Sequence, residues 1–309
     1  MATTTSITTT YAGEFAGKYI SAALLAGNTI ANGGLTIRPN VKFKEVVKRL
    51  ELDGIVKDGS CDFSDTSTLT LTERILQPKE LQVNLELCKK DFRSDWDAIQ
   101  MGYSAFDNLP SSFQEYLIGY VASKVAQKNE QNIWAGAEAE GSFDGFATLL
   151  AADNTKIAVT GTAVTASNVV EQLGLVVDAI PSALYGREDL HIYVAQNVFR
   201  AYKRSLGGFA SGGQGAAGYM AQGNNQDVNV LFFDGVKIFM ANGLASDKMV
   251  ATTKDNLWFG TGLLSDSQEV KVLDMADLDG SQNVRVIMRF TAGVQYGVSE
   301  DIVAYGIVE

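Results

Sequence analysis

The sequence predicts an α+β fold, in which helices and strands are segregated along the chain. A long helical pattern occupies residues 112–139, and runs typical of strands occupy 81–88 and much of 228–308. The hydrophobic fraction of 46% and the charged fraction of 20% are typical of a folded protein with a substantial core. With 309 residues, the chain is long enough for one large domain or two modest ones.

The first forty residues predict an arm that leads into the folded part. Residues 1–10 (MATTTSITTT) are rich in threonine and lack the basic residues and apolar run of a signal peptide. Apolar residues recur at helical spacing over 13–25, which predicts a short amphipathic helix that ends near Gly27 or Asn28. This segment is too short to span a bilayer. Residues 29–40 are expected to form an irregular link.

Residues 50–80 predict a long, twisted, two-stranded excursion. The stretch is rich in Thr, Ser and Asp, and Gly54 and Gly59 interrupt it. An isolated two-stranded hairpin is only marginally stable in water, so we expect another chain to support this one. The next run, LQVNLELC at 81–88, alternates apolar with polar residues and predicts a half-buried strand.

The longest helix is predicted at 112–139, after a serine N-cap. At a rise of 1.5 Å per residue it would be roughly 40 Å long. It leads into GSFDGFATLLAAD at 141–153, where glycines alternate with aromatic residues. The glycines permit a chain reversal, and the aromatic rings are expected to fill the space beneath it. These four residues are Gly141, Gly145, Phe143 and Phe146.

The region after residue 155 predicts shorter elements. A helix begins at Ser167 or Asn168, and Asn197 is expected to cap a second helix with the sequence VFRAYKRSL. Residues 207–224 are rich in Gly and Ala and predict a flexible loop. Strands are expected at 190–195, 228–233, 236–241, 269–274, 283–290 and about 294–308.

The formal net charge is −11, from 25 basic and 36 acidic residues. Tight general binding of nucleic acid needs many Lys and Arg contacts to phosphates, so this balance opposes it, yet it permits a protein that encloses DNA. Cys61 and Cys88 form no CxxC pair and no zinc pattern with the single histidine. No disulfide framework is expected, and a reducing cytoplasm is the default compartment.

Two stretches match ligand-binding motifs only in part. GGQGAAG at 212–218 fits Gly-x-Gly-x-x-Gly, but a dinucleotide site needs a strand before the motif and a helix after it, and here a helix precedes it. Asp277 and Asp279 lie in a calcium-loop pattern whose first and twelfth positions are Met275 and Val286, which cannot serve as acidic ligands. A mobile loop and a hairpin turn are the better interpretations.

His191 is the only histidine, and no G-x-S-x-G motif accompanies it, so a structural or surface role is favoured over a catalytic triad. Asp91, Asp95 and Asp97 form an acidic cluster of the kind usually found at solvated helix starts. The sequence therefore predicts no catalytic, cofactor-binding or metal-binding residue, no cofactor, and a protein that is not an enzyme.

The order of these segments resembles that of the Hong Kong 97-type major capsid proteins of tailed double-stranded DNA phages. The arm, the excursion at 50–80 and the long helix with its GSFDGFATLLAAD exit carry the resemblance. The later stretches LHIYVAQNVFRAYKRSL and FFDGVKIFMANGL extend it over nearly the whole chain. The chain differs in having no long helical scaffold-like segment at its N-terminus, which implies a separate scaffolding protein or none.

The resemblance implies an N-terminal arm (1–40), an E-loop (50–80), a peripheral domain with a spine helix (41–49, 81–155 and 283–309) and an axial domain (156–282). It implies a subunit that assembles as hexamers and pentamers into an icosahedral shell around a phage double-stranded DNA genome, without sequence-specific DNA binding and without a membrane. The implied partners are other copies, a portal protein and scaffolding or decoration proteins. The implied location is the virion capsid, assembled in the host cytoplasm, with loop 207–224 near the axis of each capsomer.

Two other functions stay open at this point. An encapsulin-type compartment shares the implied fold but stores enzymes, and the long arm and E-loop favour the viral shell over it. An enzyme that uses the glycine-rich loop for a nucleotide is the third hypothesis, which binding of dinucleotides would support.

Overall fold

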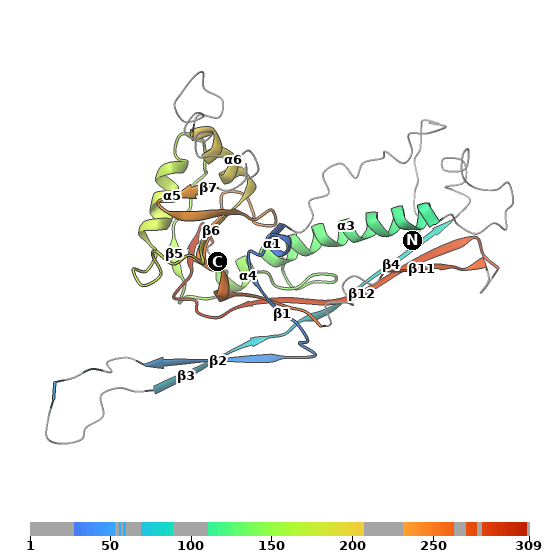
Figure 1. Ribbon diagram of the computed structural model, residues 1–309, viewed down its shortest axis with the longest axis horizontal. Coiled ribbons are helices and arrows are strands. Elements are labelled where there is room, and N and C mark those ends of the chain that lie inside the picture. The colour runs from blue at the N-terminus through green and yellow to red at the C-terminus, as the bar shows by residue number, and fades with distance from the viewer. Residues whose placement is uncertain are drawn as a thin grey trace. The chain divides into compact units, whose positions relative to one another are not determined.

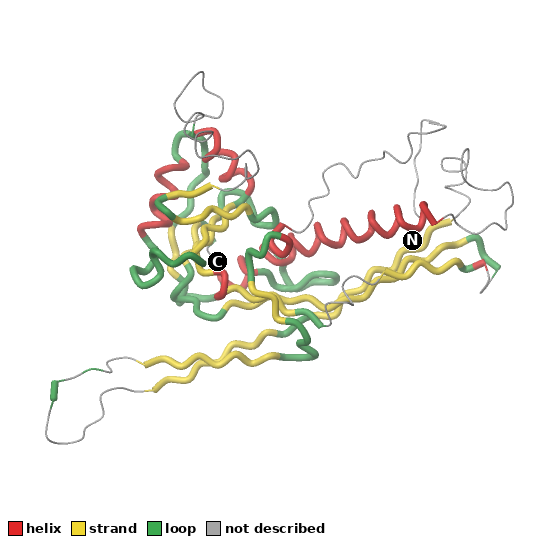
Figure 2. Tube along the Cα trace, in the orientation of Figure 1, coloured by secondary structure: helices red, strands yellow, loops and turns green. Residues whose placement is uncertain are grey.

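The computed structural model describes residues 28–52, 56, 58–59, 69–88, 111–206, 231–262, 270–276 and 280–307. Helices and strands both occur throughout this part of the chain (Figure 2). The described residues form two compact units. Unit 1 comprises 81–88, 111–128, 270–276 and 280–290, and unit 2 comprises the others. The predicted arm at 1–10, the helix at 13–25 and the loop at 207–224 lie outside the described residues.

Unit 1 is built from strands and the first part of a long helix. Its elements are β4 (Lys79–Cys88), β11 (Val270–Asp274), and the first parts of α3 (Ser111–Ala135) and β12 (Asn283–Tyr296). β12 pairs with both β4 and β11. Val121 of α3 is buried against Val284 and Val286 of β12, so the helix covers this sheet. The carboxylate of Glu86 on β4 accepts a hydrogen bond from Arg285 Nε at 3.0 Å.

One strand is longer than predicted. β11 and β12 pair antiparallel, from Val270 opposite Met288 to Asp274 opposite Val284, which confirms the predicted pairing. The prediction of a second, separate strand over 294–308 is wrong. β12 continues without a break to Tyr296 because its residues 293–296 pair with β10 (Leu257–Gly260), and only the short β13 (Val303–Tyr305) follows.

Unit 2 is centred on a six-stranded sheet of order β5-β13-β9-β6-β8-β7, of which Figure 1 labels β5, β6 and β7. Besides β13, its strands are β5 (Ile157–Val159), β6 (Leu190–Val194), β7 (Leu231–Phe233), β8 (Val236–Met240) and β9 (Met249–Thr253). β6 runs parallel to β8 and antiparallel to β9. All residues of β9 and β13 are buried, as expected for strands inside a sheet that is covered by other elements.

A two-residue turn joins β7 to β8. Asp234 has φ 48° and Gly235 has φ 78°. Positive φ at both central residues is the geometry of a type I′ turn, which suits the twist of an antiparallel hairpin and favours Asp-Gly. The predicted strands 228–233 and 236–241 are confirmed where they are described.

The helix α5 (Val169–Asp178) starts where the sequence predicted, with Asn168 as its N-cap residue. One face of the helix is directed to the interior, where Val169, Leu173 and Val176 are fully buried, whereas Val170 and Leu175 on the other side are exposed. Gln172 on the same face accepts a hydrogen bond from the Tyr305 hydroxyl at 2.6 Å. This bond satisfies a polar group that burial would otherwise leave without a partner.

The helix α6 (Gln196–Ser205) begins earlier than predicted. Its N-cap residue is Ala195, so the prediction that Asn197 caps the helix is wrong. The Asn197 amide instead donates to Asp247 Oδ1 at 2.6 Å and accepts from the Asp247 backbone N–H at 3.1 Å. This pairing fixes the start of α6 to the loop before β9, at a separation of 50 residues in sequence.

The remaining elements join the core of unit 2. They are α1 (Asn28–Ala31), β1 (Thr36–Arg38), α4 (Phe146–Ala151), the 3₁₀ turn η2 (Lys254–Asn256) and β10 (Leu257–Gly260). β1 runs parallel to β10, and β10 runs antiparallel to the end of β12. β10 and β11 therefore pair with β12 and lie outside the six-stranded sheet. No helix among the described residues is long and apolar enough to cross a membrane.

Candidate functional site

A two-stranded hairpin is the first candidate surface for contact with another molecule. β2 (Glu45–Leu52) and β3 (Leu69–Leu76) pair antiparallel with an unbroken register, and they lie side by side in Figure 1. The predicted two-stranded excursion is confirmed, and its first strand begins before residue 50. Most of the connection between the strands lies outside the described residues.

Because side chains alternate along a strand, the hairpin has two faces. The inner face is defined by Val47, Arg49, Arg74 and Leu76. The outer face is defined by Val46, Lys48, Leu71, Glu73 and Ile75. The two faces differ in what they contact.

The inner face is attached to the core of unit 2. Leu76 is fully buried in a cluster with Val41 and Trp258. Gly260 makes room for it, because a Cβ there would lie 2.9 Å from Leu76 Cδ2. Arg49 forms an ion pair of 2.9 Å with Glu300. These contacts attach the inner face of the hairpin base to unit 2.

Arg74 of the inner face contacts Asp153, Ser299 and Tyr296. Its Nη2 lies 2.6 Å from Asp153 Oδ2 and 3.0 Å from Ser299 Oγ, and its guanidinium lies 4.4 Å from the centre of the Tyr296 ring. Tyr296 also donates its hydroxyl to Asp153 at 2.7 Å. Partial burial opposes ionisation of Asp153, but hydrogen bonds from Thr155, Tyr296 and Arg74 outweigh it and lower the pKa of this carboxyl well below its usual range.

The outer face exposes apolar side chains. Val46 is 46% exposed, Ile75 directly opposite it is 47% exposed, and Leu71 is 52% exposed. Lys48 and Glu73 form a surface ion pair of 3.7 Å between them. A single exposed apolar residue is ordinary, but a group on one face of an anchored hairpin marks a surface that gains from being covered.

The end of the long helix is a second feature that the sequence pointed to. The helix was predicted to reach about residue 139, which is wrong, because α3 ends at Ala135. The carbonyl of Gly136 accepts hydrogen bonds from the backbone N–H of Gly145 at 2.9 Å and from Thr148 Oγ1 at 2.5 Å. The returning chain thus takes the place of the next helical turn.

The predicted chain reversal, with aromatic rings packed beneath it, is confirmed. Gly141 has φ +72°, and a Cβ on Gly145 would lie 2.4 Å from the Asn132 carbonyl oxygen. Phe143 and Phe146 are buried, 5% and 0% exposed. The turn is narrow because glycine allows it to pass against the helix end, and the two rings occupy the interior beneath it.

A buried carboxylate attaches the first described segment to the same helix end. Glu130 is 2% exposed and accepts hydrogen bonds from the backbone N–H of Thr29 at 3.0 Å and from Thr29 Oγ1 at 2.5 Å. Trp134 Nε1 donates to Thr29 Oγ1 at 2.8 Å. Burial raises the pKa of Glu130, while the bonds from Thr29 and from the backbone N–H groups of Gly243 and Asn242 act against that rise.

Of the residues that the sequence offered for chemistry, His191 is described. It is half-buried on β6, its Nδ1 lies 2.8 Å from the Asp189 carbonyl oxygen, and its ring stacks on Tyr193. Burial lowers its pKa, so the neutral imidazole is favoured. These contacts fit the structural role that the sequence favoured. Among the described residues, no three His, Cys, Asp or Glu side chains gather as they would around a metal ion.

The other chemical candidates lie outside the described residues. They are the glycine-rich motif at 212–218, the acidic cluster Asp91, Asp95 and Asp97, the pair Asp277 and Asp279, and Cys61. Cys88, at the end of β4, is a free thiol.

Sequence reasoning missed the roles of Glu130 and Arg74. A glutamate three residues before the apolar pair Ile133-Trp134 was the one available signal of a buried carboxylate.

Comparison with known proteins identifies the fold. No protein-family model and no curated protein matches the sequence. Among solved structures, the capsid of a native GTA particle matches with a TM-score of 0.59 at 12% identity, over 92% of this chain and 91% of that one. The capsid of Myoviridae phage XM1 matches with a TM-score of 0.55 at 12% identity, over 91% and 92%. A satellite phage P4 procapsid that includes the size determination (Sid) protein matches with a TM-score of 0.53 at 9% identity, over 91% and 98%.

These matches extend over nearly the full length of both chains in each pair, so they concern the whole architecture. At identities of 9–12% they establish the fold. The resemblance expected from the order of segments is thereby confirmed at the level of structure. The chain has the Hong Kong 97-type fold found in the capsids of tailed phages and of GTA particles.

Proposed function

We propose that this protein is a major capsid protein, which assembles as hexamers and pentamers into an icosahedral shell around double-stranded DNA. The observation that carries the proposal is the hairpin β2–β3 within a capsid fold. Its inner face is fixed by Leu76 and Arg74, while its outer face exposes Val46, Leu71 and Ile75. A hairpin built in this way is suited to cover, and be covered by, a neighbouring subunit.

The domain organisation proposed for the subunit follows the same fold. Residues 50–80 form the E-loop, with the strands of its base starting at Glu45. Residues 1–40 form the arm, 41–49, 81–155 and 283–309 form the peripheral domain around the spine helix α3, and 156–282 form the axial domain. We add β10 and β11 to the peripheral domain, because both pair with β12.

The proposed partners are those of a shell subunit. Other copies of the chain come first, and a portal protein and scaffolding or decoration proteins follow. The solved P4 procapsid includes a size determination protein, which supports a size-setting partner for this chain as well. DNA is enclosed without sequence-specific contacts, in keeping with the net charge of −11. The proposed location is the virion, after assembly in the host cytoplasm, and no enzymatic activity is part of the proposal.

An encapsulin-type compartment is the second candidate, because it would use the same fold. The long arm and E-loop that the resemblance implies favour the phage shell. The contents of purified particles distinguish the two functions. Nuclease-protected double-stranded DNA in particles from infected cells supports the phage shell, whereas particles filled with an enzyme and free of DNA support the compartment.

The proposal is tested by producing the chain alone and with neighbouring viral genes, followed by electron microscopy. Closed particles with fivefold and sixfold units are expected. Deletion of residues 57–66 at the tip of the hairpin should reduce particle yield while the subunit keeps its melting temperature. A deletion variant that forms normal particles would show that the hairpin tip is not an assembly contact.

A further inference from the structure

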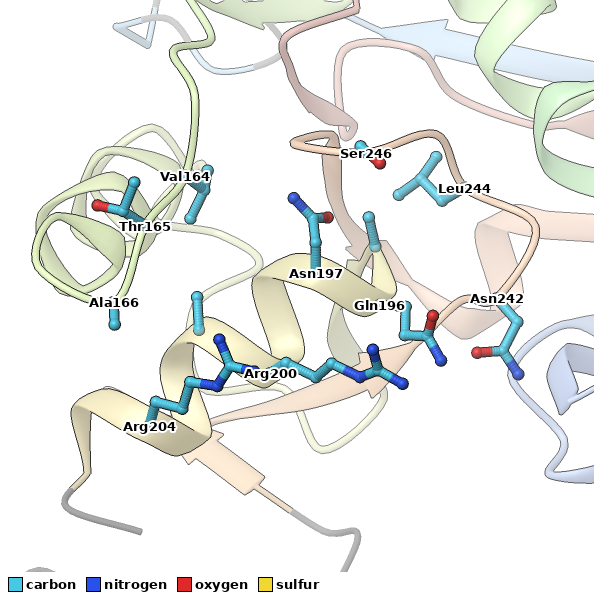
Figure 3. A pocket seen from close by; sticks show the side chains of 12 residues that line it. Val164, Thr165, Ala166, Gln196, Asn197, Arg200, Arg204, Asn242, Leu244 and Ser246 are labelled. Carbon is cyan, nitrogen blue, oxygen red and sulfur yellow. The ribbon is translucent and has the colours of Figure 1, made fainter. Parts of the chain in front are cut away.

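A cavity of about 610 Å³ lies in unit 2 beside the helix α6. Arg200 and Arg204 line it from the same face of α6, one helical turn apart, as Figure 3 shows. Twelve residues form the lining, and none is an aspartate or a glutamate. In a chain with 36 acidic and 25 basic residues, this composition makes the cavity locally positive.

The walls of the cavity are held in place by one carboxylate behind them. Asp247 Oδ1 accepts hydrogen bonds from the backbone N–H of Val164 at 2.9 Å and from Asn197 Nδ2 at 2.6 Å. The loop before α5, the start of α6 and the loop before β9 thus meet at a single residue. This carboxylate is not among the lining residues, and the two hydrogen bonds that it accepts hold the walls together.

The two arginines differ from most other arginines of the described chain. Five described arginines lie within 4 Å of a carboxylate: Arg38, Arg49, Arg74, Arg187 and Arg285. No described carboxylate lies within that distance of Arg200 or Arg204, and both side chains are exposed. Arg289 in unit 1 is likewise exposed, with no described carboxylate within that distance. A guanidinium is the side chain best suited to bind a carboxylate through two parallel hydrogen bonds.

We propose that this cavity receives a carboxylate-bearing segment of a second copy of the chain. Arg200 and Arg204 bind the carboxylates, and the apolar lining residues Val164, Ala201 and Leu244 contact the aliphatic stems. Each copy carries a net charge of −11, so copies repel one another unless positive groups lie at their contacts. The inference rests on the proposed function, because it assigns this cavity to an interface within the assembled shell.

A protein carboxylate fits the observations better than a nucleic-acid phosphate. The apolar part of the lining suits the stem of a Glu or Asp side chain, whereas a nucleic-acid backbone presents sugar and charge throughout. The overall negative charge of the chain also opposes tight general binding of DNA. DNA as the ligand is therefore a competing outcome that the experiment must separate.

The first arm of the test compares particle yield by sedimentation for wild type, R200E/R204E and R200K/R204K. Reversal of both charges is expected to lower the particle yield about tenfold or more. Because both side chains are exposed, the melting temperature of the subunit should stay unchanged. R200K/R204K keeps both positive charges but lacks the planar guanidinium that binds a carboxylate through two hydrogen bonds, so an intermediate particle yield is expected. If wild type forms particles and R200E/R204E forms as many, the inference is wrong and the proposed function stands. If wild type forms no particles under any condition, both the inference and the proposed function are wrong.

The second arm identifies the ligand. Particles of R200K/R204K, assembled from equal amounts of ¹⁵N-labelled and unlabelled chains, are treated with a zero-length carbodiimide and digested. Cross-links between position 200 or 204 and an acidic residue, in peptide pairs of mixed isotope, support the proposal. Cross-links only within one chain, or a loss of packaged DNA at normal particle yield in R200E/R204E, would overturn it.

Discussion

Arg74 Nη2 lies 2.6 Å from Asp153 Oδ2, which joins the hairpin β2–β3 to the segment that follows α4. Both side chains are mostly shielded from solvent, at 31% and 15% exposure. The pair is shared with Tyr296, which donates to the same carboxylate oxygen. The hairpin is therefore anchored at its base by a charged network in addition to the burial of Leu76.

This network predicts a stability that depends on acidity. The folded state lowers the pKa of Asp153 below its usual value of 3.8, so the stabilisation is fully present above pH 3.8 and is lost as the pH falls further. Asp153→Asn should reduce the free energy of unfolding by about 1–3 kcal/mol at pH 7. The difference between the two proteins should shrink below about pH 4 in denaturant titrations of unassembled subunits. An equal difference at pH 7 and pH 3 would contradict this role.

The buried Glu130 predicts the opposite dependence. Because burial raises its pKa above 4.5, the contribution of this group to stability is greatest below pH 4.5 and falls as the pH rises through the folded value. Glu130→Gln should flatten the pH dependence of the melting temperature between about pH 4.5 and 7. Glu138→Gln, an exposed glutamate beyond the helix end, is the control and should leave the profile unchanged.

The turn after α3 predicts a sharp difference between two glycines. Gly145→Ala should lower the free energy of unfolding by about 1–3 kcal/mol, because the added Cβ meets the Asn132 carbonyl oxygen at 2.4 Å. Gly174→Ala is the matched control, since Gly174 lies inside α5 with open space around its Cα. There, alanine should stabilise by about 0.5–1 kcal/mol. Denaturant midpoints for the two variants check both signs, and equal effects would refute the argument.

The outer face of the hairpin predicts a loss of assembly without a loss of folding. Threonine at Val46, Leu71 and Ile75 keeps the preference for strand but removes apolar surface. The triple variant should form fewer particles, because each Å² of apolar area buried between subunits contributes about 25 cal/mol before entropic costs. Its melting temperature as a subunit should change little.

The matched control for that variant lies on the inner face. Leu76→Ala removes a fully buried side chain and should cost about 2–5 kcal/mol of subunit stability. The two variants thus separate assembly from folding. The interpretation of the outer face is wrong if the triple threonine variant unfolds the subunit or assembles at the wild-type yield.

The sequence revealed those parts of the fold that depend on local chemistry. The alternation over 81–88, the start of α5 at Asn168 and the glycine–aromatic turn at 141–153 each follow from spacing and residue type. The start of α6 was mispredicted because Asn197 bonds to Asp247, 50 residues away, which no local pattern reveals. The length of β12 was mispredicted for a similar reason, since its partners β10 and β11 decide where it ends.

The candidate site was less predictable than the fold. A two-stranded excursion was visible in the composition of 50–80, but its two faces depend on register with β3 and on contacts such as Arg74 with Asp153, which are 79 residues apart. The bond of Thr29 to Glu130 spans 101 residues. The cavity beside α6 forms where three separate loops and helices meet, so its positive lining could not be read from the order of residues.

The central claim is that this chain builds a closed shell. Electron cryomicroscopy of the purified protein, produced with its neighbouring viral genes where needed, tests it most directly. We expect particles with icosahedral symmetry, in which the hairpin β2–β3 of one subunit lies against the next. Only monomers of 33.2 kDa under every condition, with a folded subunit by circular dichroism, would contradict the account.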